Sequence, residues 1–300
     1  MPHASVNGIQ LEYEVSGKGE PLLLIMGLGA QLIHWPDSFV DRLVACGFQV
    51  IRFDNRDAGL STKFNGEALP LWRSMLASVA KPLATSYYRL ADMAADATGL
   101  LDHLDIARAH IVGASMGGMI AQKIAILSPD RVASLTSIMS TTGNRRVGAA
   151  SMRLWRSMPP LMKGTRETAV DRGVALSRLL SGREFNESAV RELTTKAVNR
   201  SFCPEGTARQ LAAISVGSDR TPWLRKVTAP TLVVHGRSDP LVNKSGGIAT
   251  AKAIPGSRLV IFDGMGHNLP AERYAELAAA IRELANRAPV SAPTYSQSGR

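Results

Sequence analysis

The pentapeptide Gly113–Gly117 (GASMG) places a serine, Ser115, between two glycines in the pattern Gly-x-Ser-x-Gly. The predicted strand His110–Val112 precedes it, and the predicted helix Met116–Leu127 follows it directly. In this context the pattern indicates a sharp strand-to-helix turn, which strains the serine backbone and exposes its hydroxyl at the carboxyl edge of a sheet. The alternative is a Gly/Ser loop that only caps the helix. We interpret Ser115 as a nucleophile.

A serine nucleophile needs a base, and the base needs an acid to orient it. His267 lies in the stretch GMGHN, just after the apolar run Arg258–Phe262. Asp239 lies in GRSDP, just after the preceding predicted strand, Thr231–His235. Both residues therefore leave the carboxyl ends of strands, at the same sheet edge as Ser115. We predict His267 as the base and Asp239 as the acid, in the chain order Ser, Asp, His that this kind of turn accompanies.

Other residues compete for these two roles. Asp263 is the rival acid, but it precedes the histidine by four residues on the same strand exit, so it is badly placed to reach the far imidazole nitrogen. The competing histidines are His3 near the terminus, His34 in a loop, His103 on a helix, His110 at the start of a strand and His235 at the end of one. His267 is favoured because it combines a loop at the right edge with glycine neighbours.

A tetrahedral intermediate also needs N–H donors for its oxyanion. The backbone N–H of Met116 follows the nucleophile and is the first candidate. The second is the N–H of Leu28, in the turn Gly27-Leu28-Gly29 after the predicted strand Pro21–Met26. The alternative is that these glycines only turn the chain.

Positioning these residues requires a sheet, and the hydrophobic pattern predicts one. The predicted strands alternate with helical stretches, which implies parallel βαβ units. The strands are an N-terminal hairpin over Ala4–Val15 with its turn at Asn7-Gly8, then Pro21–Met26, Phe48–Phe53, His110–Val112, Val132–Met139, Thr231–His235 and Arg258–Phe262. The helices are a stretch that ends at Gly47, then Leu90–Leu104, Met116–Leu127, a stretch to about Ile254, and Ala271–Ala288. The predicted fold class is α/β, with a mostly parallel, doubly wound sheet.

One segment interrupts this alternation. Residues 143–221 contain no convincing strand and have turn signals at Pro159-Pro160, Gly164 and Ser181-Gly182. We interpret them as short helices that form a lid, or cap, inserted into a core of residues 1–142 and 222–287. Residues 288–300, rich in Pro and Ser, are expected to be a disordered tail.

The composition excludes several classes of protein. The chain has 300 residues, 45% of them hydrophobic and 20% charged, as in ordinary globular proteins. No apolar run is long enough for an integral membrane segment, and the N-terminus carries no secretory signal pattern. Its two cysteines, Cys46 and Cys203, make neither a disulfide framework nor a metal cluster. We expect a cytoplasmic protein.

The formal net charge of +10 is unevenly distributed. Residues 143–221 hold fourteen Lys and Arg against seven Asp and Glu, so most of the excess lies in the predicted cap. A solvated, Arg-rich face is the simpler interpretation, and a cap that attracts anionic esters is the alternative. No nucleic-acid partner is expected, because no binding motif accompanies the charge.

Some further residues have structural interpretations. The polar loop Asn55–Ser61 is expected to be architectural, with Gly59 at the turn and Arg56 and Asp57 in loop hydrogen bonds. The two cysteines are expected to pack. Six large apolar side chains could belong to the core or line an acyl pocket, and we favour the core. They are Trp35, Trp72, Trp155, Met152, Met158 and Met162.

From Val6 to about Arg287 the chain resembles the α/β-hydrolase superfamily. The segments LIMGLG, GASMGGMIAQ and GMGHNLP are similar to the branch that contains aclacinomycin methylesterase and bacterial carboxylesterases. The resemblance implies the same triad and the same oxyanion donors as above. Two departures stand out: Met26-Gly27-Leu28-Gly29 replaces the common His-Gly-x-Gly, and the predicted cap has no motif for polyketide recognition.

The expected function is hydrolysis of small to medium carboxylic esters through an acyl-enzyme intermediate, with no metal or organic cofactor. A lactonase, a thioesterase or a cofactor-free perhydrolase could use the same triad. Epoxide hydrolases and haloalkane dehalogenases are disfavoured because those relatives carry Asp at the position of Ser115. The non-enzymatic alternative is a ligand receptor on a hydrolase fold. The expected partner is a small-molecule ester, and the oligomeric state is left open.

Overall fold

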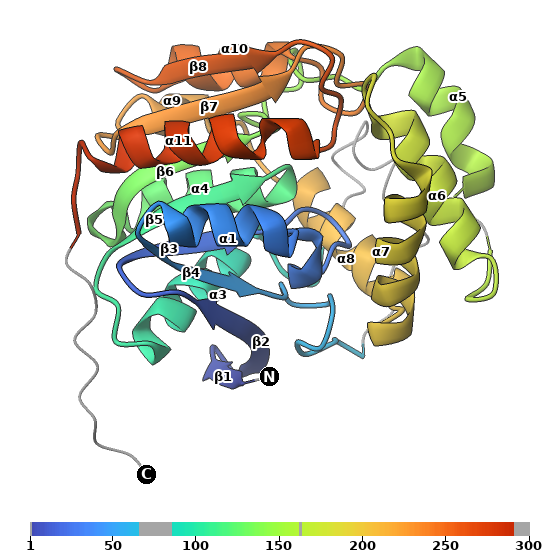
Figure 1. Cartoon of the computed structure of the whole chain (residues 1–300), viewed down its shortest axis with the longest axis horizontal. Helices are drawn as coiled ribbons and strands as arrows, with labels where there is room; N and C mark the ends of the chain where they lie inside the picture. The colour runs from blue at the N-terminus through green and yellow to red at the C-terminus, as the bar shows by residue number, and fades with distance from the viewer. Residues whose placement is uncertain (1, 66–85, 162–163, 291–300) are drawn as a thin grey trace.

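The computed structural model describes residues 2–65, 86–161 and 164–290 and contains one eight-stranded sheet (Figure 1). The strands are β1 His3–Val6, β2 Ile9–Ser16, β3 Glu20–Ile25, β4 Phe48–Phe53, β5 Ala109–Ala114, β6 Val132–Ile138, β7 Thr231–Gly236 and β8 Arg258–Phe262. Their order across the sheet is β1-β2-β4-β3-β5-β6-β7-β8. The pairs β1–β2 and β2–β4 are antiparallel, and all other neighbours are parallel. The predicted mostly parallel α/β sheet is confirmed.

The antiparallel end of the sheet begins with a tight hairpin. Asn7 and Gly8, which join β1 to β2, have φ of 50° and 74°. Positive φ at both central positions matches the right-handed twist of the flanking strands, and Asn-Gly adopts it with little strain. The hairpin predicted from this dipeptide is confirmed.

Helices cover both faces of the sheet (Figure 1). The α-helices are α1 Asp37–Ala45, α3 Leu90–His103, α4 Met116–Leu127, α5 Met152–Leu161, α6 Ala169–Leu180, α7 Glu187–Arg200, α8 Pro204–Ser215, α9 Thr221–Leu224, α10 Ser245–Ala253 and α11 Tyr274–Ala285. Short 3₁₀ turns occur at Leu32–His34, Pro129–Arg131 and Ala271–Arg273. One face packs against α3, α4, α9 and α10, and the other packs against α1 and α11.

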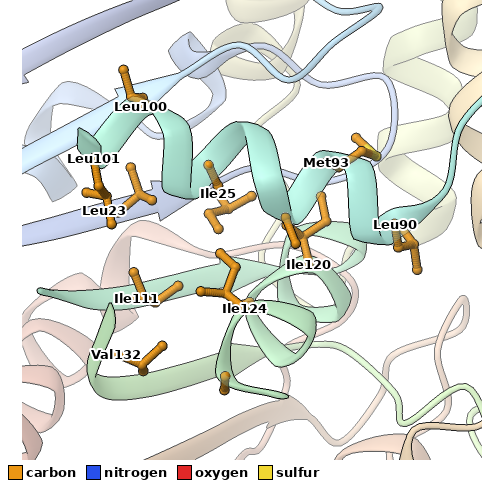
Figure 2. Close-up of a cluster of buried hydrophobic side chains, with 14 of the residues drawn as sticks. Leu23, Ile25, Leu90, Met93, Leu100, Leu101, Ile111, Ile120, Ile124 and Val132 are labelled. Atoms are coloured by element: carbon orange, nitrogen blue, oxygen red, sulfur yellow. The ribbon is translucent and has the colours of Figure 1, made fainter. Parts of the chain in front are cut away.

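The central strands are apolar on both sides because both faces are covered. In β3, Leu23 and Ile25 join the cluster under α3 and α4, whereas Leu22 and Leu24 face α1 and α11. Figure 2 shows the first cluster, in which side chains of α3 and α4 meet those of β3, β5 and β6. Burial of one such side chain contributes about 1.5–3 kcal/mol relative to exposure. This packing stabilises the central strands, from which the loops at the carboxyl edge of the sheet leave.

The strand order reverses at the centre of the sheet. From β3 the chain passes to β4 on one side, and later returns to β5 on the other side of β3. Ile25 of β3 pairs in register with Gly113 of β5, so the loops after these two strands start side by side. Open α/β sheets bind ligands at such a switch point, beyond the carboxyl ends of the strands.

Helices α5–α8 follow β6 and precede β7, and we call them the inserted helices. They gather at one end of the sheet, on the right of Figure 1. Two ion pairs join them to the loop after β4: Arg200 of α7 lies 2.6 Å from Asp54, and Arg209 of α8 lies 2.8 Å from Asp57. They therefore contact the carboxyl edge of the sheet. Their existence as a separate cap domain, with the limits 143 and 221, stays a prediction.

Most predicted elements differ from the structure by one or two residues at their ends. The segment before α11 begins with a 3₁₀ turn instead of α-helix. Helix α5 runs through Pro159-Pro160 to Leu161, so the turn predicted at these two prolines is wrong. A proline lacks the backbone N–H that a helix uses, and here the helix ends one residue after the pair. In the described ranges no helix is long and apolar enough to cross a membrane.

Candidate active site

Ser115 occupies a strained turn between β5 and α4, with φ 56° and ψ −117°. Glycine is required on both sides because a Cβ on Gly113 would lie 2.1 Å from the Gly117 carbonyl oxygen, and a Cβ on Gly117 would lie 2.0 Å from that of Ile25. The turn is fixed to the neighbouring strand, since the Ser115 N–H donates to the Ile138 carbonyl at 2.9 Å. The strained serine predicted from the sequence pattern is therefore present, directly before a helix N-terminus.

Three side chains from separate loops meet at this turn. His267 Nε2 lies 2.9 Å from Ser115 Oγ, and His267 Nδ1 lies 2.7 Å from Asp239 Oδ2. A carboxylate can only accept, so Nδ1 carries the proton of the neutral imidazole, and Nε2 is left to accept from the serine hydroxyl. The structure thus brings Ser115, His267 and Asp239 into one hydrogen-bonded chain.

Asp239 is fully buried and anchored on both oxygens. Its Oδ1 accepts the backbone N–H groups of Leu241 and Val242 at 2.9 and 2.8 Å. Its Oδ2 faces His267 and, at 3.4 Å, His235 Nε2. Burial raises the pKa of Asp239, but the hydrogen bonds from His235, His267 and the backbone outweigh it and lower the pKa to about 2. The carboxylate is consequently ionised throughout the neutral range.

The rival residues have other partners. Asp263 is exposed and forms an ion pair with Arg237, which lowers its pKa, whereas the carboxylate at His267 Nδ1 belongs to Asp239. The other histidines are engaged elsewhere: His3 with Glu12, His34 with Gln31, His103 against the ring of Tyr13, His110 with Glu20 and Ser134, and His235 with the Val242 carbonyl. In the described part of the chain, only His267 contacts the Ser115 hydroxyl.

The two predicted oxyanion donors, Met116 and Leu28, belong to segments that adjoin Ser115. Met116 is the first residue of α4, and its N–H has no hydrogen-bond partner within the described ranges. The loop after β3 packs directly on the serine, because a Cβ on Gly27 would lie 3.1 Å from Ser115 Cβ. The N–H of Leu28, the next residue, also lacks a partner among the described residues. Their role as oxyanion donors stays a prediction.

The polar loop after β4 is architectural, as its sequence indicated. Arg56 makes a buried, bidentate ion pair with Asp96 at 2.6 and 2.7 Å. Asp57 accepts the same kind of pair from Arg209, and Gly59 has φ +53° with no room for a Cβ beside Asp54. Such charges are stable in the interior only because each is paired.

Sequence reasoning missed the contribution of the inserted helices to this edge. Gln210 of α8 is fully buried and accepts the Gly29 N–H at 2.8 Å. The Leu180 carbonyl at the end of α6 accepts the His267 N–H at 2.7 Å. Neither contact has a sequence signal, because a glutamine or leucine on a helix face carries no sign of its partner, which lies 181 residues away for Gln210 and 87 residues away for Leu180.

The large apolar side chains divide between core and surface. Trp35 is buried and stacks on Phe39, whereas Trp155 and Met152 are 40% and 67% exposed, so the core interpretation was wrong for these two. An amphipathic helix at the outer surface, α5, presents them instead of burying them. Trp72 and Met162 lie outside the described residues. Cys46 and Cys203 are half-buried free thiols.

Part of the positive charge of residues 143–221 is used in structural contacts. Arg200, Arg209 and Arg220 are held in the interior or at the junction with the sheet. Arg178 and Arg191 pair with Glu187 and Asp171 on the surface. The remaining exposed arginines include Arg146, Arg153 and Arg156.

In the described ranges no group of three or more His, Cys, Asp or Glu side chains could hold a metal ion.

Comparison with known proteins identifies a family. The family described as the alpha/beta hydrolase fold matches residues 20–274. Rhodomycin D methylesterase DnrP of Streptomyces peucetius is 30% identical over 308 aligned residues, which cover 94% of this chain and 97% of that protein. Rhodomycin D methylesterase DauP of Streptomyces sp. strain C5 is also 30% identical, over 87% of this chain and 89% of that protein.

A solved structure extends the likeness to three dimensions. The enol-lactonase of Burkholderia xenovorans LB400 superimposes with a TM-score of 0.74 at 24% identity, covering 95% of this chain and all of that one. At this identity the likeness concerns the fold alone. With the family match over most of its length, its sheet order and its strained Ser115 turn, the chain belongs to the α/β-hydrolase family.

Proposed function

We propose that the protein is a serine carboxylic-ester hydrolase that works through an acyl-enzyme intermediate. The observation that carries the proposal is the hydrogen-bonded chain from Ser115 through His267 to Asp239, with contacts of 2.9 and 2.7 Å. The relatives at 30% identity support an ester substrate, since both are named as methylesterases.

In acylation, Ser115 Oγ attacks the ester carbonyl carbon while its proton passes to His267 Nε2. Asp239 holds the imidazole by Nδ1 and stabilises the imidazolium that forms. The carbonyl oxygen becomes negative and accepts the N–H groups of Met116 and Leu28, each worth about 2.7–4 kcal/mol in such sites. The imidazolium then protonates the leaving alkoxide, and the Ser115 ester remains.

Deacylation repeats these steps with water. His267 Nε2 removes a proton from a water molecule as that oxygen attacks the acyl carbon. The same two amides receive the negative charge, and the proton returns to Ser115 Oγ as the carboxylic acid leaves. The position of Ser115 at the N-terminus of α4 favours the anionic intermediates, because the helix dipole is positive there.

A substrate panel tests this proposal. Purified protein should hydrolyse short-chain methyl and p-nitrophenyl esters, followed by proton release, with higher kcat/KM than matched lactones and acyl thioesters. A perhydrolase would instead be identified by peracid formation from acetate and hydrogen peroxide. No turnover of any ester, by a folded sample, would contradict the proposal and favour a ligand receptor.

A further inference from the structure

Gln210 of α8 spans the distance between two backbone groups beside the candidate site. Its Oε1 accepts the N–H of Gly29 at 2.8 Å, and its Nε2 donates to the carbonyl of Arg56 at 2.7 Å. The side chain is fully buried. It therefore links the loop after β3, where Leu28 lies, to the loop after β4.

A primary amide matches both backbone partners of Gln210, the Gly29 N–H and the Arg56 carbonyl. A backbone N–H can only donate and a backbone carbonyl can only accept, so the bridging side chain must offer one acceptor and one donor at once. A glutamate would place a second acceptor against the Arg56 carbonyl, and a methionine would leave both buried groups unpaired, at about 1–3 kcal/mol each. An asparagine is one methylene too short to reach both. The chemistry of the position thus fits glutamine.

The neighbours of Gln210 hold it in place. The preceding residue, Arg209, forms a buried two-pronged ion pair with Asp57 at 2.8 and 2.9 Å. Arg56, whose carbonyl Gln210 contacts, is itself fixed by its own pair with Asp96. Because paired buried charges resist displacement, this part of α8 has a fixed register against the sheet edge.

The loop that Gln210 holds also contacts the core and the loop after β4, since Leu28 packs on the apolar cluster and Asn55 Nδ2 donates to the Met26 carbonyl at 3.0 Å. Gly27 packs against Ser115, and Gly29 has φ +67°. The Ala30 N–H donates to the Gly27 carbonyl at 3.3 Å, which closes a turn around Leu28. Gly29 is thus held by Gln210 on one side of Leu28, and Gly27 meets the nucleophile on the other.

We propose that Gln210 is a positioning residue, which keeps the Leu28 N–H directed at the oxyanion. This inference rests on the proposed ester-hydrolase function. An oxyanion donor is effective only when it is already placed where charge develops, and a displacement of about 1 Å can cost about 10²-fold in rate. Helix α8, one of the inserted helices, thereby contributes to the oxyanion site.

The test compares Gln210→Met with the parent, using p-nitrophenyl acetate and a trifluoromethyl ketone that forms a tetrahedral adduct with serine. We expect kcat to fall about 10–100-fold, with KM within about 3-fold, and the affinity for the ketone to fall by a similar factor to kcat. A purely structural role would lower the melting temperature and leave kcat and the affinity for the ketone at parental values. If the methionine variant does not fold, kcat and the ketone affinity are measured for Gln210→Asn.

Gln122→Met is the matched control. Gln122 is also fully buried and bridges two groups, Ser137 and Arg220, but it does not contact the loop of Leu28. Its kcat and ketone affinity should stay within about 3-fold of the parent. A folded Gln210 variant that keeps both values at parental levels would overturn the inference and leave the proposed function intact. A parent protein that neither cleaves esters nor binds the ketone would overturn both.

Discussion

Alanine at position 115 is expected to lower kcat for p-nitrophenyl acetate by about 10⁴-fold or more, with little change in KM. The reason is that Ser115 Oγ is the atom that His267 Nε2 contacts at 2.9 Å and, in the proposed mechanism, the protein atom that bonds to the acyl carbon. Residual turnover would come from water attacking an ester whose carbonyl oxygen is held by the Leu28 and Met116 amides. Steady-state kinetics of the purified Ser115→Ala variant measures the effect.

A second serine variant controls for any loss of folded protein. Ser134 is buried on β6 and its hydroxyl contacts His110, at the opposite end of the strand from the candidate site. Ser134→Ala should keep kcat within about 3-fold of the parent, even if its melting temperature falls. Parental activity in Ser115→Ala would show that another nucleophile carries the reaction.

Asp239→Asn is expected to lower kcat by about 10⁴-fold at neutral pH. The backbone N–H groups of Leu241 and Val242 require an acceptor, so the asparagine oxygen must stay where Oδ1 now lies. The amide NH₂ then faces His267 Nδ1, which has to accept from it. The imidazole proton moves to Nε2, which can no longer take the proton of Ser115.

The kinetic loss in Asp239→Asn is measured beside Asp263→Asn, the same chemical change at the rival acid. Asp263 is exposed and paired with Arg237, so its variant should stay within about 3-fold of the parent. Equal losses in the two variants, or a loss confined to Asp263→Asn, would contradict the assignment of Asp239. Near-ultraviolet circular dichroism of both variants verifies the fold.

Much of the core fold could be predicted because it follows local rules. Asn7-Gly8 specifies a hairpin through its backbone conformation, and β3, β4, β6, β7 and β8 end within one residue of the predicted limits. Strand β5 is longer than predicted, since it runs from Ala109 to Ala114. The exact limits depended on tertiary contacts. Helix α5, for example, continues through Pro159-Pro160, which sequence rules treat as a turn.

The three side chains at Ser115 could be selected because each follows a strand at the same sheet edge, and parallel topology brings such positions together. Gln210 and Leu180 could not, because their roles depend on how α6 and α8 dock on loops far away in sequence. The exposure of Trp155 and Met152 was missed for a related reason: the apolar face of a helix predicts burial only if another element covers it.

The most direct measurement is the mass of the protein after reaction with a fluorophosphonate, followed by identification of the modified peptide. A serine activated by His267 should attack the phosphorus, release fluoride and remain as a stable adduct. We predict one adduct per chain, on the peptide that contains Ser115, with simultaneous loss of esterase activity and no labelling of Ser115→Ala. An active protein that stays unlabelled, or carries the label on another residue, would contradict the assignment of Ser115 as the nucleophile.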